Sequence, residues 1–168
     1  MANQAAVSID MSAQDTQNQY LTFFLAGEEY GVSILDVQEV KVWEGVTSIP
    51  NAPVYVKGVL DLRGQIVPVI DLRIRFNMES VDYDETTVIV VLKIEVGDNT
   101  HVIGIVVDAV SDVLDVSDEQ QKAAPDFESS GNTEFISGIA TVNNKMVILL
   151  DSNKLLSRKE IAAIAQKD

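Results

Sequence analysis

The chain has 168 residues and 46% of them are hydrophobic, which is enough for the core of one domain or of two small ones. Its formal net charge of -14 argues against nucleic acid or an anionic membrane as the main partner. It contains no cysteine, so disulfides, thiolate chemistry and cysteine metal sites are excluded.

The first 18 residues are polar and lack both the basic and the apolar region of a signal peptide. No apolar run approaches the roughly 18 residues of a membrane span. We therefore expect a disordered tail over residues 1–18 and a cytoplasmic protein.

Runs of β-branched and aromatic residues, separated by turn residues, predict strands along the first half of the chain. In order, the predicted elements are a strand at Tyr20–Leu25, a returning strand from Tyr30, a helical turn running into a strand over Ile34–Trp43, a hairpin of Val59–Leu62 with Ile66–Ile70, and a short helix or turn over Asp71–Phe76 with Asp71 as its N-cap.

The second half repeats this alternation after a polar linker at residues 77–85. Its predicted elements are strands at Thr86–Val96, His101–Val107 and Ala109–Val116, a polar loop over Ser117–Gly131, a hairpin of Phe135–Val142 with Met146–Leu150, and a C-terminal helix opened by a capping box from Ser157 to Glu160.

Two blocks of the first half match two blocks of the second, which indicates an internal duplication. Residues 31–40 lie over residues 104–113 with an offset of 73, and each block begins with a glycine. Residues 56–59 and 66–71 lie over residues 136–139 and 146–151 with an offset of 80. The seven-residue difference falls in a loop, where insertions are tolerated.

Each copy carries about five strands in roughly 65 residues, the size of a small closed or partly open barrel. Units of this size are marginal alone, so we expect the two barrels to share a core. We place the first β-barrel subdomain at residues 19–82, the second at residues 83–156 and the C-terminal helix at residues 157–168.

Arg63 lies at the tip of the first predicted hairpin, followed by Gly64. The second copy has Asn143 and Asn144 at the corresponding tip. A tight turn therefore does not require arginine at this position, which favours a recognition role for Arg63 over that of an incidental turn residue.

The chain lacks the residue groupings of common catalytic and metal sites. It has one histidine, His101, which we expect at a strand edge, and it has no phosphate-binding glycine loop or nucleophile elbow. Asp108 and Asp112 fit a polar face better than a cation site. We expect no enzyme, no catalytic residue, no cofactor and no metal.

The ordered motifs resemble the CheW family of chemotaxis coupling proteins over about residues 19–157. The motifs are Glu29–Val32, Val37–Val40, Val56–Gly64 and Val67–Arg73, with Gly104–Asp108 and Val110–Val113 in the second half. The resemblance implies an all-β fold of two five-stranded SH3-like barrels around a shared hydrophobic core, with short helices and a C-terminal helix. Asp61 stands where the family usually has asparagine.

The resemblance also implies a non-enzymatic adaptor that joins the cytoplasmic tip of methyl-accepting chemotaxis receptors to the regulatory domain of the histidine kinase CheA. Because the receptor tip is a helical hairpin, recognition would place a helix in an apolar groove with a polar rim. The residues that match the family's receptor-facing positions are Ile34, Val37, Glu39 and Arg63, with Val110 and Val113 on the opposite wall.

Each of these apolar residues also fits a core position, because its spacing suits both roles. For CheA we expect an edge-on contact between like barrels, mainly through the second half. The protein would be recruited from the cytoplasm to membrane receptor arrays. The alternatives are a CheW-like regulatory domain of another two-component system and a generic peptide-binding barrel pair.

Overall fold

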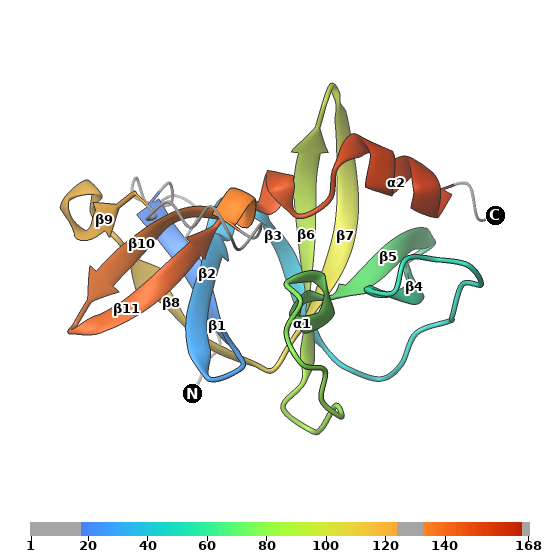
Figure 1. Cartoon of the computed structure of the whole chain (residues 1–168), viewed down its shortest axis with the longest axis horizontal. Coiled ribbons are helices and arrows are strands. Elements are labelled where there is room, and N and C mark those ends of the chain that lie inside the picture. The colour runs from blue at the N-terminus through green and yellow to red at the C-terminus, as the bar shows by residue number, and fades with distance from the viewer. Residues whose placement is uncertain (1–17, 124–132, 166–168) are drawn as a thin grey trace.

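The computed structural model describes residues 18–123 and 133–165. Two curled β-sheets lie side by side, with a short helix near their junction and a longer helix over one of them (Figure 1). The predicted all-β class is confirmed. Residues 1–17 of the tail expected at residues 1–18, residues 124–131 of the Ser117–Gly131 loop and residues 166–168 lie outside the described residues.

One sheet has six strands in the order β8-β1-β2-β11-β10-β9. These strands are β1 (Gln19–Leu25), β2 (Glu28–Ser33), β8 (Ala109–Asp115), β9 (Gln121–Lys122), β10 (Ile136–Val142) and β11 (Lys145–Leu150).

The other sheet has five strands in the order β3-β6-β7-β5-β4. These strands are β3 (Val37–Val42), β4 (Val56–Leu62), β5 (Gln65–Asp71), β6 (Val88–Val96) and β7 (Asn99–Val107). The helical elements are η3 (Ile34–Asp36), α1 (Leu72–Arg75), η4 (Asp118–Gln120), η5 (Thr133–Phe135), η6 (Ser152–Lys154) and α2 (Arg158–Ala165).

The duplication is visible in the strand pairing. The β4–β5 and β10–β11 hairpins are equivalent, and each has a register shift beside a glycine, Gly58 or Gly138. Val69 of β5 pairs in parallel with Gly104 of β7, and Leu149 of β11 pairs in parallel with Gly31 of β2. Both offsets found in the sequence, 73 and 80, therefore describe equivalent positions.

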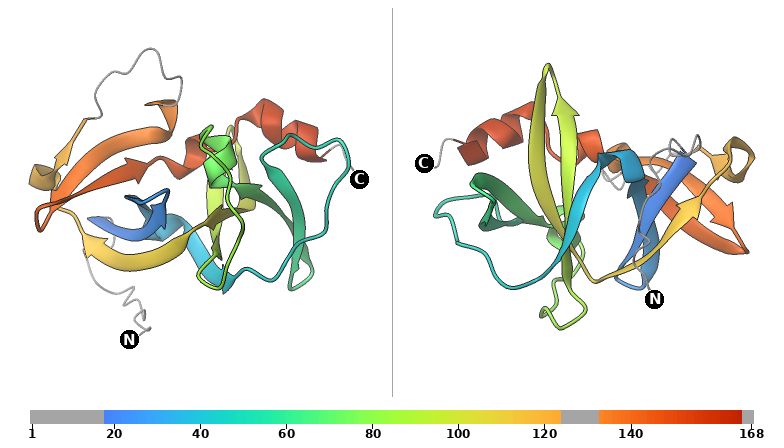
Figure 2. Two further views of the ribbon diagram at one scale, coloured as in Figure 1. Left: turned by 60° about the horizontal axis from the view of Figure 1, so that its bottom comes forward. Right: turned by 180° about the vertical axis from the view of Figure 1, so that it is seen from behind.

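The two copies exchange strands, so the sheets are not divided at residues 82 and 83 as the sequence predicted. The β1–β2 hairpin joins β8, β10 and β11 of the second copy, whereas β3, β4 and β5 join the β6–β7 hairpin. The chain crosses between sheets at η3, after β2, and at Asp108, after β7. In both views of Figure 2, β8 runs from the junction of the sheets into the six-stranded one.

The matched glycines allow each sheet to close on itself. The segment after β3 pairs with β4 through Thr47 and Val59, and the equivalent β9 pairs with β10 through Lys122 and Ile139. A Cβ on Gly58 would lie 2.1 Å from the Thr47 carbonyl oxygen, and one on Gly138 would lie 2.8 Å from that of Lys122. Only glycine fits where the closing backbone comes this near.

Three clusters of buried side chains make up the interior. The largest lies between the sheets and takes Phe23 and Val32 from one and Leu92 and Ile105 from the other. One smaller cluster, around Val69, lies inside the curled five-stranded sheet, and another lies inside the curled six-stranded sheet. The predicted shared core is confirmed.

The C-terminal helix α2 docks on the five-stranded side, a point that the sequence left open. The Ser157–Glu160 capping box forms as predicted. The Arg75 guanidinium lies between the rings of Tyr55 and Phe135, 4.8 and 4.7 Å from their centroids. It donates to Glu160 Oε1 at 3.0 Å, so α1 and α2 are joined directly.

Candidate functional site

Arg63 and Glu39 form an ion pair that joins the β4–β5 turn to β3. The Arg63 side chain is 69% exposed and that of Glu39 is 26% exposed. Next to it, Asp61 Oδ1 accepts a hydrogen bond of 2.8 Å from the Gly64 amide. Asparagine can make the same contact through its side-chain oxygen, so aspartate at this position does not change the turn.

The backbone of Arg63 adopts a left-handed conformation that long side chains disfavour. Its φ is 52° and that of Gly64 is 90°; the second hairpin has φ values of 53° and 66° at Asn143 and Asn144. Both turns thus have two successive positive φ values, a geometry for which asparagine and glycine are preferred. The turn tolerates Arg63 but does not select it.

The apolar residues predicted in the first copy lie in or against the shared core. Ile34 is 6% exposed and belongs to that core, so it supports the surface from beneath and presents almost none of it. Val37 is half-buried, packs against the same core and pairs with Leu92 across the sheet.

The two predicted valines of the second copy lie on β8, at the edge of the six-stranded sheet. Val110 lies opposite Phe23 and is 36% exposed. Val113 lies opposite Leu21 and packs partly against the shared core. The site residues are therefore carried by both sheets, and direct side-chain contact is seen between Glu39 and Arg63.

Exposed apolar side chains also occur in the elements that carry the ion pair, although Val40 and Val42 lie on the face of β3 opposite to Glu39. Leu35 in η3 is half exposed, Val40 and Val42 occupy the outward face of β3, and Ile66 follows the Arg63 turn. The repeat contained a signal for Leu35, because its match in the second copy is Asp108. An apolar residue where the other copy carries an acid points to a surface position.

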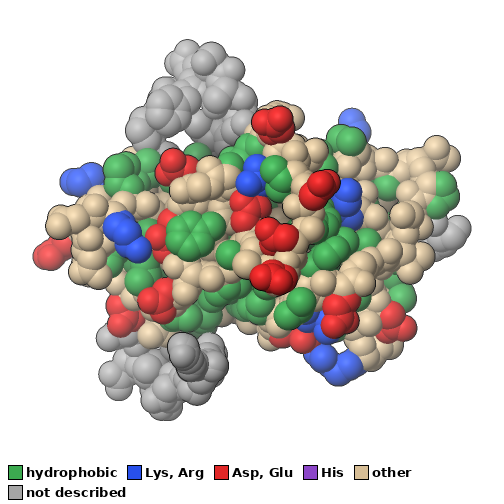
Figure 3. Space-filling view, turned by 90° about the horizontal axis from the view of Figure 1, so that it is seen from below, with side chains coloured by type: hydrophobic (Ala, Val, Ile, Leu, Met, Phe, Trp, Pro, Cys, Tyr) green, Lys and Arg blue, Asp and Glu red, His purple; other side chains and the backbone are tan. Residues whose placement is uncertain are grey.

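Negative charge lies next to the start of β3. Burial raises the pKa of Asp36, and the neighbouring carboxylates of Asp151 and Glu95 raise it further. Acidic side chains also gather near the centre of the face shown in Figure 3, with hydrophobic side chains between them. A partner that meets such surfaces would benefit from basic groups.

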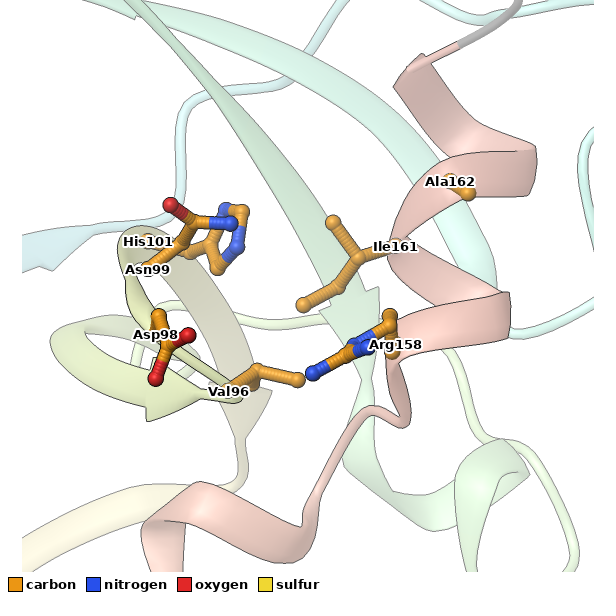
Figure 4. A pocket seen from close by; sticks show the side chains of 7 residues that line it. All are labelled: Val96, Asp98, Asn99, His101, Arg158, Ile161 and Ala162. Atoms are coloured by element: carbon orange, nitrogen blue, oxygen red, sulfur yellow. The ribbon is translucent and has the colours of Figure 1, made fainter.

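A cleft of about 400 Å³ lies apart from the predicted site, between the β6–β7 turn and α2. Figure 4 shows Arg158 reaching from α2 toward Val96, with His101 on the other side of the cleft and Ile161 on the helix. None of the six predicted receptor-binding residues lines it. His101 is the third residue of β7 and is half-buried. Because β7 lies between β6 and β5, His101 is near the start of a central strand, and the expected position at a strand edge is wrong.

Within residues 18–123 and 133–165, no group of three or more histidine, cysteine, aspartate or glutamate side chains is arranged to hold a metal ion. The helices described are also all too short or too polar to cross a membrane.

Comparison with known proteins identifies the family. A sequence model of the CheW-like domain matches residues 19–160. The chain is 44% identical to the chemotaxis protein CheW of Klebsiella aerogenes over 98% of this chain and 96% of that protein. It is 32% identical to the chemotaxis protein CheW of Treponema pallidum over 94% of this chain and 92% of that protein.

The fold agrees with this match. The crystal structure of the scaffolding protein TtCheW from Thermoanaerobacter tengcongensis superimposes with a TM-score of 0.74 at 32% identity, covering 83% of this chain and 92% of that one. Two SH3-like barrels around a common core are thus shared with a solved relative. The sequence match and the structural match together show that this chain belongs to the CheW family.

Proposed function

We propose that this chain is a non-enzymatic adaptor that couples methyl-accepting chemotaxis receptors to the histidine kinase CheA. The observation that carries the proposal is the family match over residues 19–160, with 44% identity to a chemotaxis CheW protein along nearly the whole chain. The same match disfavours a generic peptide-binding barrel pair. The adaptor would act in the cytoplasm, at arrays of membrane receptors.

We infer that receptor recognition is centred on the Glu39–Arg63 pair. Exposed ion pairs contribute about 0–1 kcal/mol to folding, so stability gives little reason for this pair. Its exposure and its position beside apolar side chains suit the polar rim of a helix-binding groove. The charges would fix the register of the receptor helix more than they would raise the affinity.

Val37, Val110 and Val113 would form the apolar walls of this groove, with Ile34 supporting them from the core. Leu35 supplies the half-exposed surface that Ile34 does not. The valines project from β3 and β8, which are matched strands of the two copies and lie at the edges of their sheets. A helix laid along the junction would meet both edges.

For the CheA regulatory domain we propose an edge-on contact through the six-stranded barrel. Met146, beside the β10–β11 turn, is 62% exposed, and its match Ile66 beside the β4–β5 turn is 60% exposed. A large exposed apolar side chain near a rigid hairpin turn is suited to a barrel-to-barrel contact. The two hairpins would then serve different partners.

A binding assay tests the receptor site. Arg63→Ala should weaken binding of a receptor-tip fragment by roughly 1–3 kcal/mol, as for an interface anchor, without loss of folding. The matched control is Arg158→Ala, which removes an exposed arginine on α2 and should leave binding unchanged. Equal binding by both variants and the unmodified chain would contradict this assignment of the receptor site.

A further inference from the structure

Asp108 lies at the single-residue connection where the chain passes from β7 in one sheet to β8 in the other. Its carboxylate accepts two hydrogen bonds from one guanidinium: Arg73 Nε donates to Oδ1 at 3.0 Å and Nη2 donates to Oδ2 at 2.6 Å. The Arg73 side chain is 15% exposed and that of Asp108 is 29% exposed. A bidentate pair of this kind fixes geometry as well as charge.

Every polar group of Asp108 is engaged, and the partners belong to both sheets. Oδ2 also accepts from the Ala26 amide at 2.9 Å, and the Asp108 amide donates to the Phe24 carbonyl at 3.0 Å; both lie in the β1–β2 hairpin. The Asp108 carbonyl accepts from Thr86 Oγ1 at 2.9 Å, just before β6. Arg73 belongs to α1, which follows β5 of the five-stranded sheet.

The matched joint elsewhere in the molecule has no such ion pair. Under the offset of 80, Arg73 corresponds to Asn153, whose Oδ1 accepts from the Glu95 amide at 2.8 Å. Under the offset of 73, Asp108 corresponds to the exposed Leu35. The matched joint therefore folds without an arginine–carboxylate pair. The need to fold does not by itself explain why Arg73 and Asp108 are paired at the other joint.

Asp108 immediately precedes the strand that carries one wall of the proposed receptor groove. Val113 lies five residues further on, about 16 Å along an extended strand. A change of about 10° in the direction of β8 would move that wall by roughly 3 Å. The other wall, with Glu39 and Arg63, belongs to the five-stranded sheet, to which Arg73 is attached.

We propose that Arg73 and Asp108 are positioning residues, which set the direction of β8 against the five-stranded sheet and thereby the width of the receptor groove. This inference rests on the proposed receptor site. Neither residue needs to touch the receptor. Loss of the pair would widen the range of relative sheet orientations while both sheets stay folded.

The test measures the joint directly. Because the chain has no cysteine, Lys93→Cys on β6 and Thr141→Cys on β10 place one spin label on an exposed position of each sheet. Pulsed electron-spin resonance then gives the distance distribution between the labels in the full chain. Asp108→Asn keeps an acceptor for the Ala26 amide but removes the charge, and Arg73→Lys keeps the charge but removes the planar fork.

We expect both variants to broaden or shift the label distance and to weaken binding of a receptor-tip fragment by about 2- to 30-fold. Glu79→Gln is the matched control, because Arg73 hydrogen-bonds to the backbone carbonyl of Glu79, which this substitution keeps. That variant should change neither readout. If Asp108→Asn is unfolded at the assay temperature, as judged by circular dichroism, Arg73→Lys carries the test.

An unchanged distance distribution in folded variants would overturn the inference, whether or not their thermal stability or receptor binding falls. A changed distribution with unchanged receptor binding would overturn the link between the joint and the groove. Failure of the unmodified chain to bind receptor fragments would instead contradict the proposed function, and the label distances would still report on the joint.

Discussion

Arg63→Asn should separate folding from receptor binding, because the structure gives Arg63 a conformation that suits asparagine better. The variant has an Asn-Gly turn, the sequence most favoured for two successive positive φ values. A left-handed non-glycine residue costs about 1–2 kcal/mol, and asparagine avoids part of that cost. The lost ion pair with Glu39 is exposed and contributes about 0–1 kcal/mol.

Because these contributions oppose each other, the free energy of unfolding of Arg63→Asn should stay within about 1 kcal/mol of that of the unmodified chain, and we expect a small increase. For a chain of this size 1 kcal/mol corresponds to roughly 2–4 °C in Tm, which thermal unfolding followed by circular dichroism resolves. Binding of a receptor-tip fragment should fall by about 1–3 kcal/mol, or roughly 5- to 150-fold in Kd.

The reciprocal variant Asn143→Arg is the control. This variant places arginine in the matched turn, where φ is 53°, so its free energy of unfolding should fall by about 1 kcal/mol. Its binding to the receptor fragment, measured without CheA, should be unchanged. A loss of more than about 2 kcal/mol of stability in Arg63→Asn, with unaltered receptor binding, would show that Arg63 is a structural residue and not a receptor contact.

Three further predictions concern stability. Gly58→Ala should lower the free energy of unfolding by roughly 3–5 kcal/mol in urea titrations, because the new Cβ would lie 2.1 Å from the carbonyl oxygen of Thr47. Gly27→Ala is the control: a Cβ there would have no neighbouring atom within 4 Å, so only the positive φ makes the change unfavourable, by about 1–2 kcal/mol. Arg75→Ala should cost about 2–4 kcal/mol and speed hydrogen exchange in α2, because the guanidinium packs on two rings and donates to α2; unchanged exchange there would exclude the anchoring role. Partial burial tends to raise the pKa values of Asp108 and Glu160, but hydrogen bonds and neighbouring arginines outweigh it, so both are lowered in the folded state. Their stabilisation is therefore complete above the ordinary carboxyl pKa and is lost as the pH falls through the lowered values, and Asp108→Asn should flatten this acid limb in unfolding measurements between neutral pH and pH ~3.

The strands and hairpins could be predicted because their signals are local. β-branched runs bounded by turn residues indicate strands regardless of their partners, and the capping box at Ser157 indicates the start of α2. Local signals do not report which copy of a duplicated strand will be the neighbour, since matched strands present similar edges. This is why the predicted division at residues 82 and 83 differs from the observed sheets.

The exchange of strands follows from the connections between them. Three residues separate β2 from β3, and one residue separates β7 from β8. Neither connection contains the glycine, proline or asparagine of a reverse turn, so the chain continues out of one sheet and into the other. By contrast, Gly27 and Gly97, both with positive φ, reverse the chain and keep β1 with β2 and β6 with β7.

The candidate site was predictable to the extent that it depends on charge. Glu39 and Arg63 stood out because a core does not need them, and the structure joins them. Charge could not separate Ile34 from Leu35, because both are apolar and adjacent; the match of Leu35 to Asp108 in the second copy was the signal that distinguished them. The 3-10 turn directs Ile34 into the shared core and leaves Leu35 half exposed.

Receptor control of CheA activity in a reconstituted system tests the adaptor function most directly. Phosphorylation of CheA is measured with receptor-tip fragments, with and without the purified full-length chain. We expect the chain to bring the kinase under receptor control and Arg63→Asn, although folded, to do so poorly. Kinase activity that is the same with and without the chain, while the chain remains folded and soluble, would contradict the proposed adaptor function.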